Sequence, residues 1–155
     1  IENALMNGYS VAWGADVSEK GFSWKNGVAI VPDADKPEIA GMESEKWEKM
    51  DANERNKLLY SFDEPVAEKT ITQKMRQEQY DNYKTTDDHG MLLTGVAQDQ
   101  KGNTFFKVKN SWSEKGSSYN GFFYASKPFV ALKTIDIMVH KDAIPQEIKD
   151  KMGIK

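Results

Sequence analysis

The sequence contains no cysteine among its 155 residues. Disulfide bonds, thiolate metal ligands and thiol nucleophiles are therefore excluded within it. It has no excess of basic charge either, because 21 Lys and Arg stand against 24 Asp and Glu. Nucleic acid is thus an unexpected partner, as is an anionic membrane surface. No apolar run approaches the roughly 18 residues of a membrane-spanning helix, so no membrane insertion is expected.

What the chain does contain indicates a globular domain. Hydrophobic residues make up 39% of it, and the aromatic residues are four Trp, six Tyr and seven Phe. A chain of this length can bury one core, so residues 1–155 are expected to form a single lobe. Because the sequence starts at Ile1 rather than at Met, and without the pattern of a secretory leader, we expect the gene product to begin further upstream. The alternative of an exported protein whose leader has been removed is left open.

Strand signals dominate the first forty residues. Apolar and small residues alternate over 9–16, and a short apolar run covers 28–31, which together predict two strands. The stretch 21–27 between them is rich in turn residues and is expected to be a turn. Residues 32–41 are polar, carry two prolines and have no apolar period, so a loop is expected there.

A helical insertion is predicted over residues 42–83. Three helix starts are indicated, with caps at Ser44, at Asp51 with Glu54, and at Thr70 with Gln73. The third helix is expected to have one solvated face and one apolar stripe, which consists of Ile71, Met75, and Tyr80 or Tyr83. The insertion therefore separates two strand-rich parts of the chain.

Beyond His89 the strand pattern returns, at 91–98, 104–110, 121–126 and 129–140. Four consecutive strands favour an antiparallel sheet or a partial barrel. Together with the inserted helices they predict an α+β fold in which the sheet carries the core.

Only two histidines are present, His89 and His140, so any histidine chemistry must use one of them. Residues 99–103 form a polar turn that would fold the strands on either side into a hairpin. That hairpin places position 111 or 112 opposite His89, and a one-residue bulge or shift brings Asn110 there, with facing Cβ atoms about 4.5–5.5 Å apart. We therefore expect His89 and Asn110 to touch.

Such a contact has a chemical use. An Asn oxygen bound to one ring nitrogen of His89 would hold the imidazole in one tautomer and leave the other nitrogen for a nucleophile. The alternative is that His89 and Asn110 are ordinary polar residues at strand ends. His140 is followed by Lys141 and Asp142, and we expect it to be an exposed residue at a strand edge.

The residues around this pair carry a family resemblance. Asp88-His89-Gly90 before an apolar strand, and Lys107 to Trp112 before a glycine-rich loop, resemble the His and Asn motifs of papain-like cysteine peptidases, whose second motif reads Asn-Ser-Trp. Within that clan, the helical insertion, the C-terminal strand and the tail look most like the bleomycin hydrolase and aminopeptidase C branch. The resemblance is close over residues 85–141, intermediate for the strand at 9–16 and loose over residues 32–82.

This resemblance implies a fold and roles for single residues. The fold would be the C-terminal, sheet-rich lobe of a papain-like cysteine peptidase, with a small helical insertion. His89 would be the general base and the ion-pair partner of a thiolate, Asn110 would orient it, and Trp112 would shelter the bond between them from water. Ser113 stands where the family usually has glycine, so the loop after Trp112 is expected to differ.

The thiol itself is expected outside these residues. Papain-type sequences place their Cys about 130–150 residues before the His. Only 88 residues precede His89 here, so we expect a missing N-terminal part that carries the Cys, and no activity from this chain alone. The whole protein would hydrolyse peptide substrates as a thiol-dependent peptidase, and more specifically as an aminopeptidase, without a metal or another cofactor. The alternative is a non-catalytic papain-like binding or interaction module.

The resemblance also implies a role for the chain end. The terminal carboxylate of Lys155 would enter the cleft and pair with the α-ammonium of a substrate, and Gly153 would supply the bend. The alternative is a surface tail. A homo-oligomer is compatible with the resemblance, which favours the cytoplasm as the compartment. No metal site is expected at Asp87, Asp88 and His89, because no further His or Cys completes it.

Overall fold

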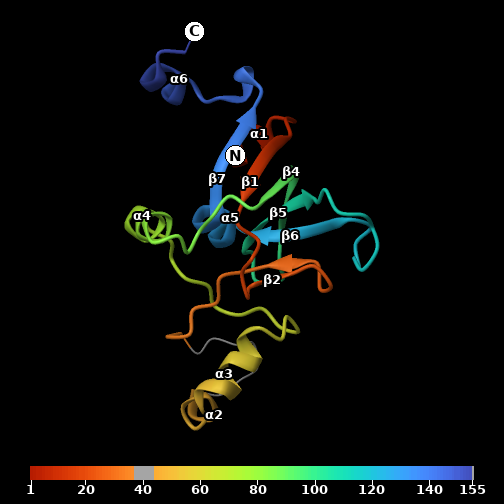
Figure 1. The fold of residues 1–155 in the computed structure, drawn as a ribbon, viewed down its shortest axis with the longest axis vertical. Coiled ribbons are helices and arrows are strands. Elements are labelled where there is room, and N and C mark those ends of the chain that lie inside the picture. The colour runs from red at the N-terminus through yellow and green to blue at the C-terminus, as the bar shows by residue number, and fades with distance from the viewer. Residues whose placement is uncertain (37–43, 155) are drawn as a thin grey trace.

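The centre of the molecule is a seven-stranded sheet. The computed structural model describes residues 1–36 and 44–154. Its strands are β1 Val11–Ala15, β2 Phe22–Ser23, β3 Val28–Ala29, β4 His89–Gln98, β5 Thr104–Lys109, β6 Phe122–Ser126 and β7 Thr134–Val139. The helices are α1 Glu2–Met6, α2 Ser44–Glu48, α3 Ala52–Leu59, α4 Gln73–Asp81, α5 Lys127–Lys133 and α6 Gln146–Met152, with a 3-10 turn, η1, at Lys141–Ala143. In Figure 1, α2 and α3 lie at one end of the molecule and α6 at the other.

The strand order is β2-β3-β6-β5-β4-β1-β7. Neighbouring strands are antiparallel except for β3 and β6, which are parallel. β4 and β5 form the expected hairpin, and Asp99 stabilises its turn by accepting hydrogen bonds from the backbone N–H groups of Lys101 and Asn103. β1 lies between β4 and β7, so a strand from the start of the chain completes a sheet built mainly from its second half.

The core lies against this sheet. Its largest fully buried apolar side chains come from four strands and one helix: Val11, Trp13, Leu93, Val108, Phe123 and Phe129. α1 contributes Ala4 and α5 contributes Phe129 and Val130 to the same cluster. Burying one large apolar side chain stabilises a fold by roughly 1.5–3 kcal/mol, so this cluster is the main source of stability. The predicted α+β fold with a sheet-based core is confirmed.

The first part of the predicted strand 129–140 is wrong, because helix α5 extends to Lys133 and only β7 is a strand. The Ser126 side chain accepts a hydrogen bond from the N–H of Phe129 at 3.1 Å, and Pro128 lies in the first turn. Both features start helices. They therefore outweigh the apolar alternation that suggested a strand. The remaining strand, β7, pairs with β1.

The stretch 21–27 also differs from expectation. It contains β2, which pairs with β3 in a small hairpin whose turn includes Gly27 at φ +64°. The strand expected at 28–31 is limited to its first two residues. Of the expected loop 32–41, residues 32–36 are described, and Pro32 makes an isolated bridge with Glu68. The rest of that loop lies outside the described residues.

The first two predicted helices are present, but only the second has the predicted cap. α2 includes Ser44 as its first residue, whereas the prediction made Ser44 the cap that precedes the helix. The start of α3 is a complete capping box, in which the Asp51 carboxylate accepts from the N–H of Glu54 at 2.8 Å and the Glu54 carboxylate accepts from the N–H of Asp51 at 3.0 Å. The division into one lobe with an insertion over 42–83 stays a prediction, and the first two residues of that insertion lie outside the described ranges.

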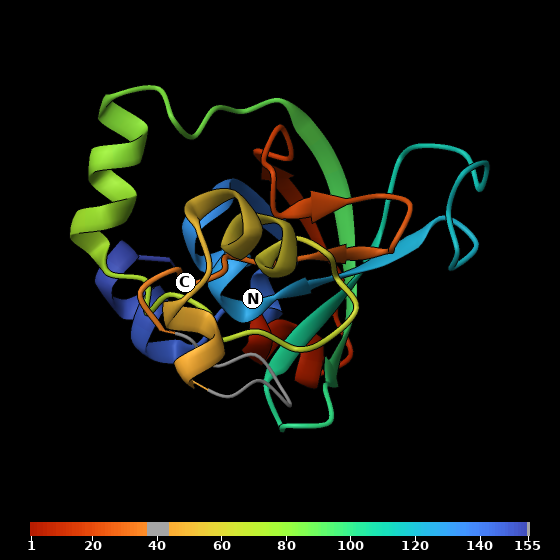
Figure 2. The same cartoon turned by 90° about the horizontal axis from the view of Figure 1, so that it is seen from below.

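Helix α4 corrects two further predictions. Its cap is Thr72 rather than Thr70, since the Thr72 hydroxyl accepts from the N–H of Met75 at 3.2 Å. The expected apolar stripe is not buried, because no residue of α4 is buried and Tyr80 and Tyr83 are 60% and 84% exposed. The stripe stays exposed because α4 stands at one side of the molecule, joined to β4 by a long stretch of chain (Figure 2).

The C-terminal part lies at the Val139 end of β7. His140 is exposed, as expected, stacks on Tyr9 and accepts a hydrogen bond at Nδ1 from the N–H of Asp142 at 3.3 Å. α6 has no buried residue and ends at Gly153 with φ +66°. Within the described residues, no helix has the length and apolar character needed to cross a bilayer.

Candidate active site

β4 begins at His89, and sheet pairing holds the backbone of this residue. In β1 its partner is Ala15, the last residue of that strand. The burial pattern places His89 on the same face of β4 as the buried Met91 and Leu93. The imidazole therefore emerges at the rim of the core, where it is half-buried rather than fully exposed.

Asn110 follows directly after β5 and is 3% exposed. Its N–H donates to the carbonyl of Gly121 at 3.0 Å, which continues the pairing toward β6. Its side-chain oxygen Oδ1 lies 2.6 Å from Nε2 of His89. An amide oxygen can only accept, so Nε2 carries the proton and Nδ1 keeps its lone pair. The predicted contact is confirmed, and it assigns the two ring nitrogens different tasks.

The way in which the two side chains meet differs from the prediction. The pairing of β4 with β5 runs to Leu92 and Lys109, and continuing it sets Met91, not His89, opposite Asn110. The contact is therefore diagonal, and diagonal neighbours at about 7–8 Å are within reach of long side chains. A bulge is present between Leu93 and Gly95, but it does not bring Asn110 directly opposite His89.

Trp112 covers one side of the His89 ring. The ring centroids are 4.7 Å apart with the planes tilted by 43°. The backbone N–H of Trp112 donates to Asn110 Oδ1 at 3.4 Å. Phe22 and Trp24 meet the Trp112 ring edge to face, with centroids at 5.9 and 5.5 Å. At 43% exposed, Trp112 is not a core residue. Its position agrees with the predicted sheltering role, which itself stays a prediction.

The loop after Trp112 is well held. Trp24 donates its indole N–H to the carbonyl of Lys115 at 3.3 Å, and turns with positive φ occur at Gly116, Asn120 and Gly121. Ser113 is not among the residues with positive φ, so this position does not require the conformational freedom of glycine. The hydroxyl of Ser111, next to Asn110, lies 3.4 Å from Nε2 of His89.

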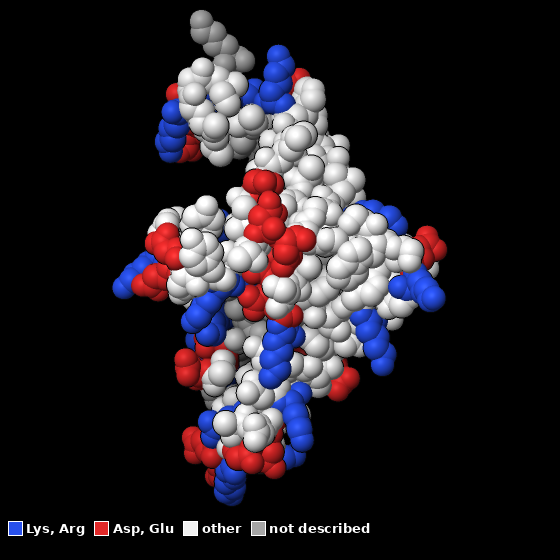
Figure 3. Space-filling view, in the orientation of Figure 1, with Lys and Arg blue, Asp and Glu red and all other residues white. Residues whose placement is uncertain are grey.

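A hollow of about 730 Å³ opens beside His89 and Asn110. Gly14 and Gly90, which are strand partners, line it together with the acidic residues Asp87, Asp88 and Asp136. Figure 3 shows Asp and Glu atoms gathered in a band along the middle of one face. Within residues 1–36 and 44–154, no group of three or more His, Cys, Asp or Glu side chains is arranged to hold a metal ion.

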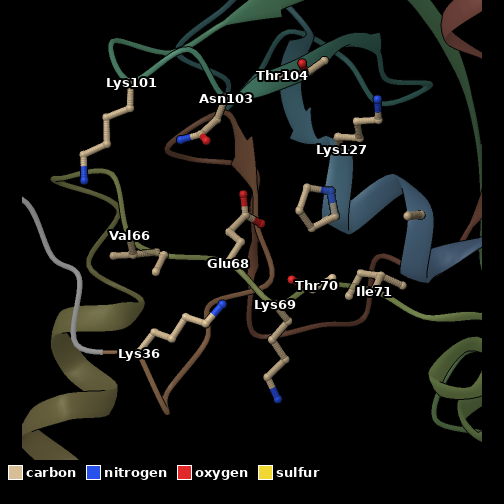
Figure 4. Close-up of a pocket in the computed structure, with 13 residues that line it drawn as sticks. Lys36, Val66, Glu68, Lys69, Thr70, Ile71, Lys101, Asn103, Thr104 and Lys127 are labelled. Atoms are coloured by element: carbon tan, nitrogen blue, oxygen red, sulfur yellow. The ribbon is translucent and has the colours of Figure 1, made fainter.

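A second hollow, of about 680 Å³, does not include His89 or Asn110. In Figure 4, the carboxylate of Glu68 stands in its middle, and Lys101 and Lys36 reach in from the surrounding loops. Glu68 accepts hydrogen bonds at 2.6 Å from the N–H of Val31 and from the hydroxyl of Ser126. Burial raises the pKa of Glu68 despite these bonds. Sequence reasoning missed this residue, because a single Glu in a polar segment gives no signal.

Lys155 lies outside the described residues, so its predicted role stays a prediction. The preceding helix α6 follows β7 at the Val139 end, where β7 pairs with Val11. His89 lies at the other end of β1, next to Ala15.

Comparisons with known proteins place this geometry in a family. The sequence model described as the Peptidase C1-like family matches residues 41–154. The chain belongs to this family. Aminopeptidase C of Lactococcus lactis subsp. cremoris is 42% identical over 60 residues, which are 38% of this chain and 14% of that protein. Aminopeptidase C of Listeria monocytogenes is 31% identical over 90 residues, which are 58% of this chain and 20% of that protein.

The crystal structure of PepW from Lactobacillus rhamnosis HN001 has a similar fold. It superposes with a TM-score of 0.53 at 23% identity, over 93% of this Peptidase C1-like chain and 26% of PepW. The predicted resemblance to papain-like peptidases of the aminopeptidase C branch is confirmed. The chain spans a fifth or less of the length of these two curated relatives.

Proposed function

We propose that this chain is the His- and Asn-bearing part of a cysteine-type aminopeptidase. The observation that carries the proposal is the 2.6 Å bond from Nε2 of His89 to Asn110, because it leaves Nδ1 free to face a nucleophile. Membership of the Peptidase C1-like family and the similarity to proteins named Aminopeptidase C support it. The thiol comes from residues outside this sequence, which has no cysteine.

His89 moves the protons of the reaction. Its Nδ1 takes the proton of the thiol, which produces a thiolate and an imidazolium held in place by Asn110. The thiolate attacks the carbonyl carbon of the first peptide bond. Nδ1 then gives its proton to the departing amine, which leaves a thioester. Water hydrolyses this thioester, with Nδ1 of His89 accepting the proton of that water.

Asn110 and Trp112 support this cycle without changing charge. The Asn110 oxygen keeps the Nε2–H tautomer and stabilises the imidazolium form of His89. Trp112, against the His89 ring, keeps water from one side of their hydrogen bond, and a bond in a drier environment is electrostatically stronger.

In a complete protein that ends at Lys155, the carboxylate of this residue is proposed to bind the α-ammonium of the substrate. A charge-assisted pair of this kind favours peptides with free amino ends and crowds out internal peptide bonds. In the complete protein, deletion of residues 153–155 should then lower aminopeptidase activity and permit cleavage within longer peptides. Unchanged specificity after that deletion would make the end a surface tail.

The experiment that tests the main proposal uses the complete protein and aminoacyl-fluorogenic substrates. His89→Ala should lower kcat/KM by at least about 10³-fold, as expected for loss of a catalytic base. His140→Ala is the matched control and should leave the rate unchanged, because His140 stacks on Tyr9 beyond the far end of β1. Full activity in His89→Ala would contradict the proposal. A complete protein without a reactive thiol would favour the non-catalytic binding module.

A further inference from the structure

Two buried charged side chains lie close to the strand ends that hold His89. Asp16 is 2% exposed and Lys133 is 3% exposed. Neither has a part in the proton transfers described above. Removing a charge from water costs several kcal/mol unless its surroundings compensate, so the contacts of this pair need an explanation.

Lys133, the last residue of α5, gathers several segments around its ammonium. The Nζ atom donates to the carbonyl of Lys84 at 3.0 Å, to the hydroxyl of Thr85 at 3.0 Å and to the side-chain oxygen of Gln79 at 3.1 Å. It also contacts the carboxylate of Glu19 and lies 4.0 Å from Oδ2 of Asp16. The Thr85 hydroxyl in turn donates a hydrogen bond to the side-chain oxygen of Gln79 at 3.1 Å. One cation therefore joins α4, the segment before β4 and the segment after β1.

Asp16 completes the same connection from the opposite side. Its Oδ2 accepts from the N–H of Thr86 at 3.0 Å, and its Oδ1 accepts from the N–H and hydroxyl of Ser18. The N–H of Asp16 donates to the carbonyl of Lys133 at 3.1 Å. Burial alone would raise the pKa of Asp16, but these hydrogen bonds and the charge of Lys133 outweigh it and lower that pKa. Asp16 is therefore an anion at neutral pH.

Both partners act next to His89 in the fold. Ala15, the residue before Asp16, is the strand partner of His89. Residues 16–19 follow the end of β1, and residues 84–88 lead into β4. The contacts of Asp16 and Lys133 join these two segments. The position of the backbone just before His89 is thus set by buried charges rather than by loop sequence alone.

We propose that Lys133 and Asp16 are positioning residues, which keep His89 in the Nε2–H tautomer against Asn110 by fixing the chain that enters β4. The role rests on the proposed function, in which His89 is the base. A hydrogen bond of 2.6 Å tolerates little displacement, and a shift of the backbone at residues 84–88 would carry the ring away from Asn110.

The test measures the His89 ring itself, by nitrogen NMR of the labelled 155-residue chain. The ring-nitrogen shifts report the ratio of Nε2–H to Nδ1–H tautomer, and His140 serves as an internal reference because only two histidines are present. Lys133→Met keeps the length of the side chain and removes its ammonium. The ratio of Nε2–H to Nδ1–H tautomer at His89 should fall about fivefold, the factor that corresponds to the net free energy of one hydrogen bond. The ratio at His140 should stay unchanged.

Control and rescue variants separate positioning from general stability. Lys127→Met is the matched control, because Lys127 begins the same helix and pairs with Glu2 at 2.7 Å on the surface. It should leave the His89 ratio unchanged. Lys133→Arg keeps the charge and should restore part of the ratio. Thr85→Val, which removes only the hydroxyl that Lys133 binds, should lower the ratio in the same direction, whereas Thr85→Ser should not.

The result that overturns the proposal is an unchanged His89 ratio in Lys133→Met, even if its melting temperature falls. If Lys133→Met does not fold, Thr85→Val decides in the same way. This measurement needs neither the thiol nor a substrate. A complete protein without peptidase activity would therefore contradict the proposed function while leaving the tautomer result intact.

Discussion

The sheet around His89 and the helical segment over 44–83 are held together in different ways. β4 pairs with β1 over its first half and with β5 over the rest, and its inner residues Met91 and Leu93 join the main core. In the helical segment, α2 and α3 bury Trp47 and Leu59, which are not part of that core cluster. α4 buries no residue at all.

Single side chains anchor the helical segment instead. Arg55 of α3 donates to the carbonyls of Trp47 and Glu48, both at 3.1 Å. Arg76 of α4 donates to the carbonyls of Ala131 and Thr134, the latter at 3.1 Å. The difference teaches that strand β4 is held by many backbone bonds and by core packing, whereas each helix depends on one or two side chains. Substitutions should therefore act globally in the sheet and locally in the helical segment.

The largest effect is expected in the sheet core. Phe123 is fully buried in β6 and packs edge to face on Phe22 at 5.2 Å. Phe123→Ala should lower the free energy of unfolding by about 3–5 kcal/mol through lost burial and a cavity. Urea denaturation followed by circular dichroism measures this loss. A loss below about 1 kcal/mol would contradict the assignment of this cluster as the main core.

A smaller and local effect is expected at Arg76. Arg76→Met removes the charged donor of these two hydrogen bonds and should destabilise α4 by about 1.5–3 kcal/mol, the range for hydrogen bonds that involve a charged group. Amide hydrogen exchange should accelerate in residues 73–81 and stay slow in β4 and β5. The control is Lys74→Met on the same helix, where an exposed pair with Glu78 at 3.7 Å contributes no more than about 1 kcal/mol. Equal acceleration throughout the sheet would erase the proposed difference between the two regions.

The start of α3 provides a third test. Asp51→Ala removes the carboxylate of the capping box and should lower stability by about 1 kcal/mol, with loss of helix confined to α3. Asp51→Asn should retain most of that stability, since Asn is also a favoured cap. Thermal unfolding with backbone chemical shifts as the readout distinguishes these outcomes. Equal destabilisation by Ala and Asn would mean that charge, not capping, matters here.

The smallest effect is a pH dependence that arises at Glu68. Burial raises its pKa in the folded protein, so its contribution to stability is complete at low pH and is lost as pH rises through the folded pKa. Glu68→Gln keeps an oxygen for Val31 and Ser126 and cannot ionise. The variant should match the wild type near pH 4 and exceed it at pH 8, in urea denaturation at both values. If the variant is less stable than the wild type at pH 8, ionised Glu68 stabilises the fold and the prediction is wrong.

The candidate site was more predictable than the fold around it. A polar turn at 99–103 sets which residues of β4 and β5 can meet, so counting along the chain brought Asn110 close to His89. The count placed position 111 or 112 opposite His89 and needed a bulge or shift to reach Asn110, whereas the contact is diagonal. Helix α5 was missed because Ser126 and Pro128 begin a helix within a run that alternates like a strand. The stripe on α4 was misjudged because periodicity cannot tell whether a surface exists to cover it.

By itself, the sequence determined the absence of a thiol, the hairpin that joins His89 to Asn110 and the motifs shared with papain-like peptidases, because turn chemistry and spacing act over short distances. Only the tertiary structure decided that β1 lies between β4 and β7 and that α5 ends with a buried cation. Asp16 and Thr86 are 70 positions apart, and Lys133 and Glu19 are 114 apart. Contacts over such distances depend on how the whole sheet packs, and no local pattern encodes them.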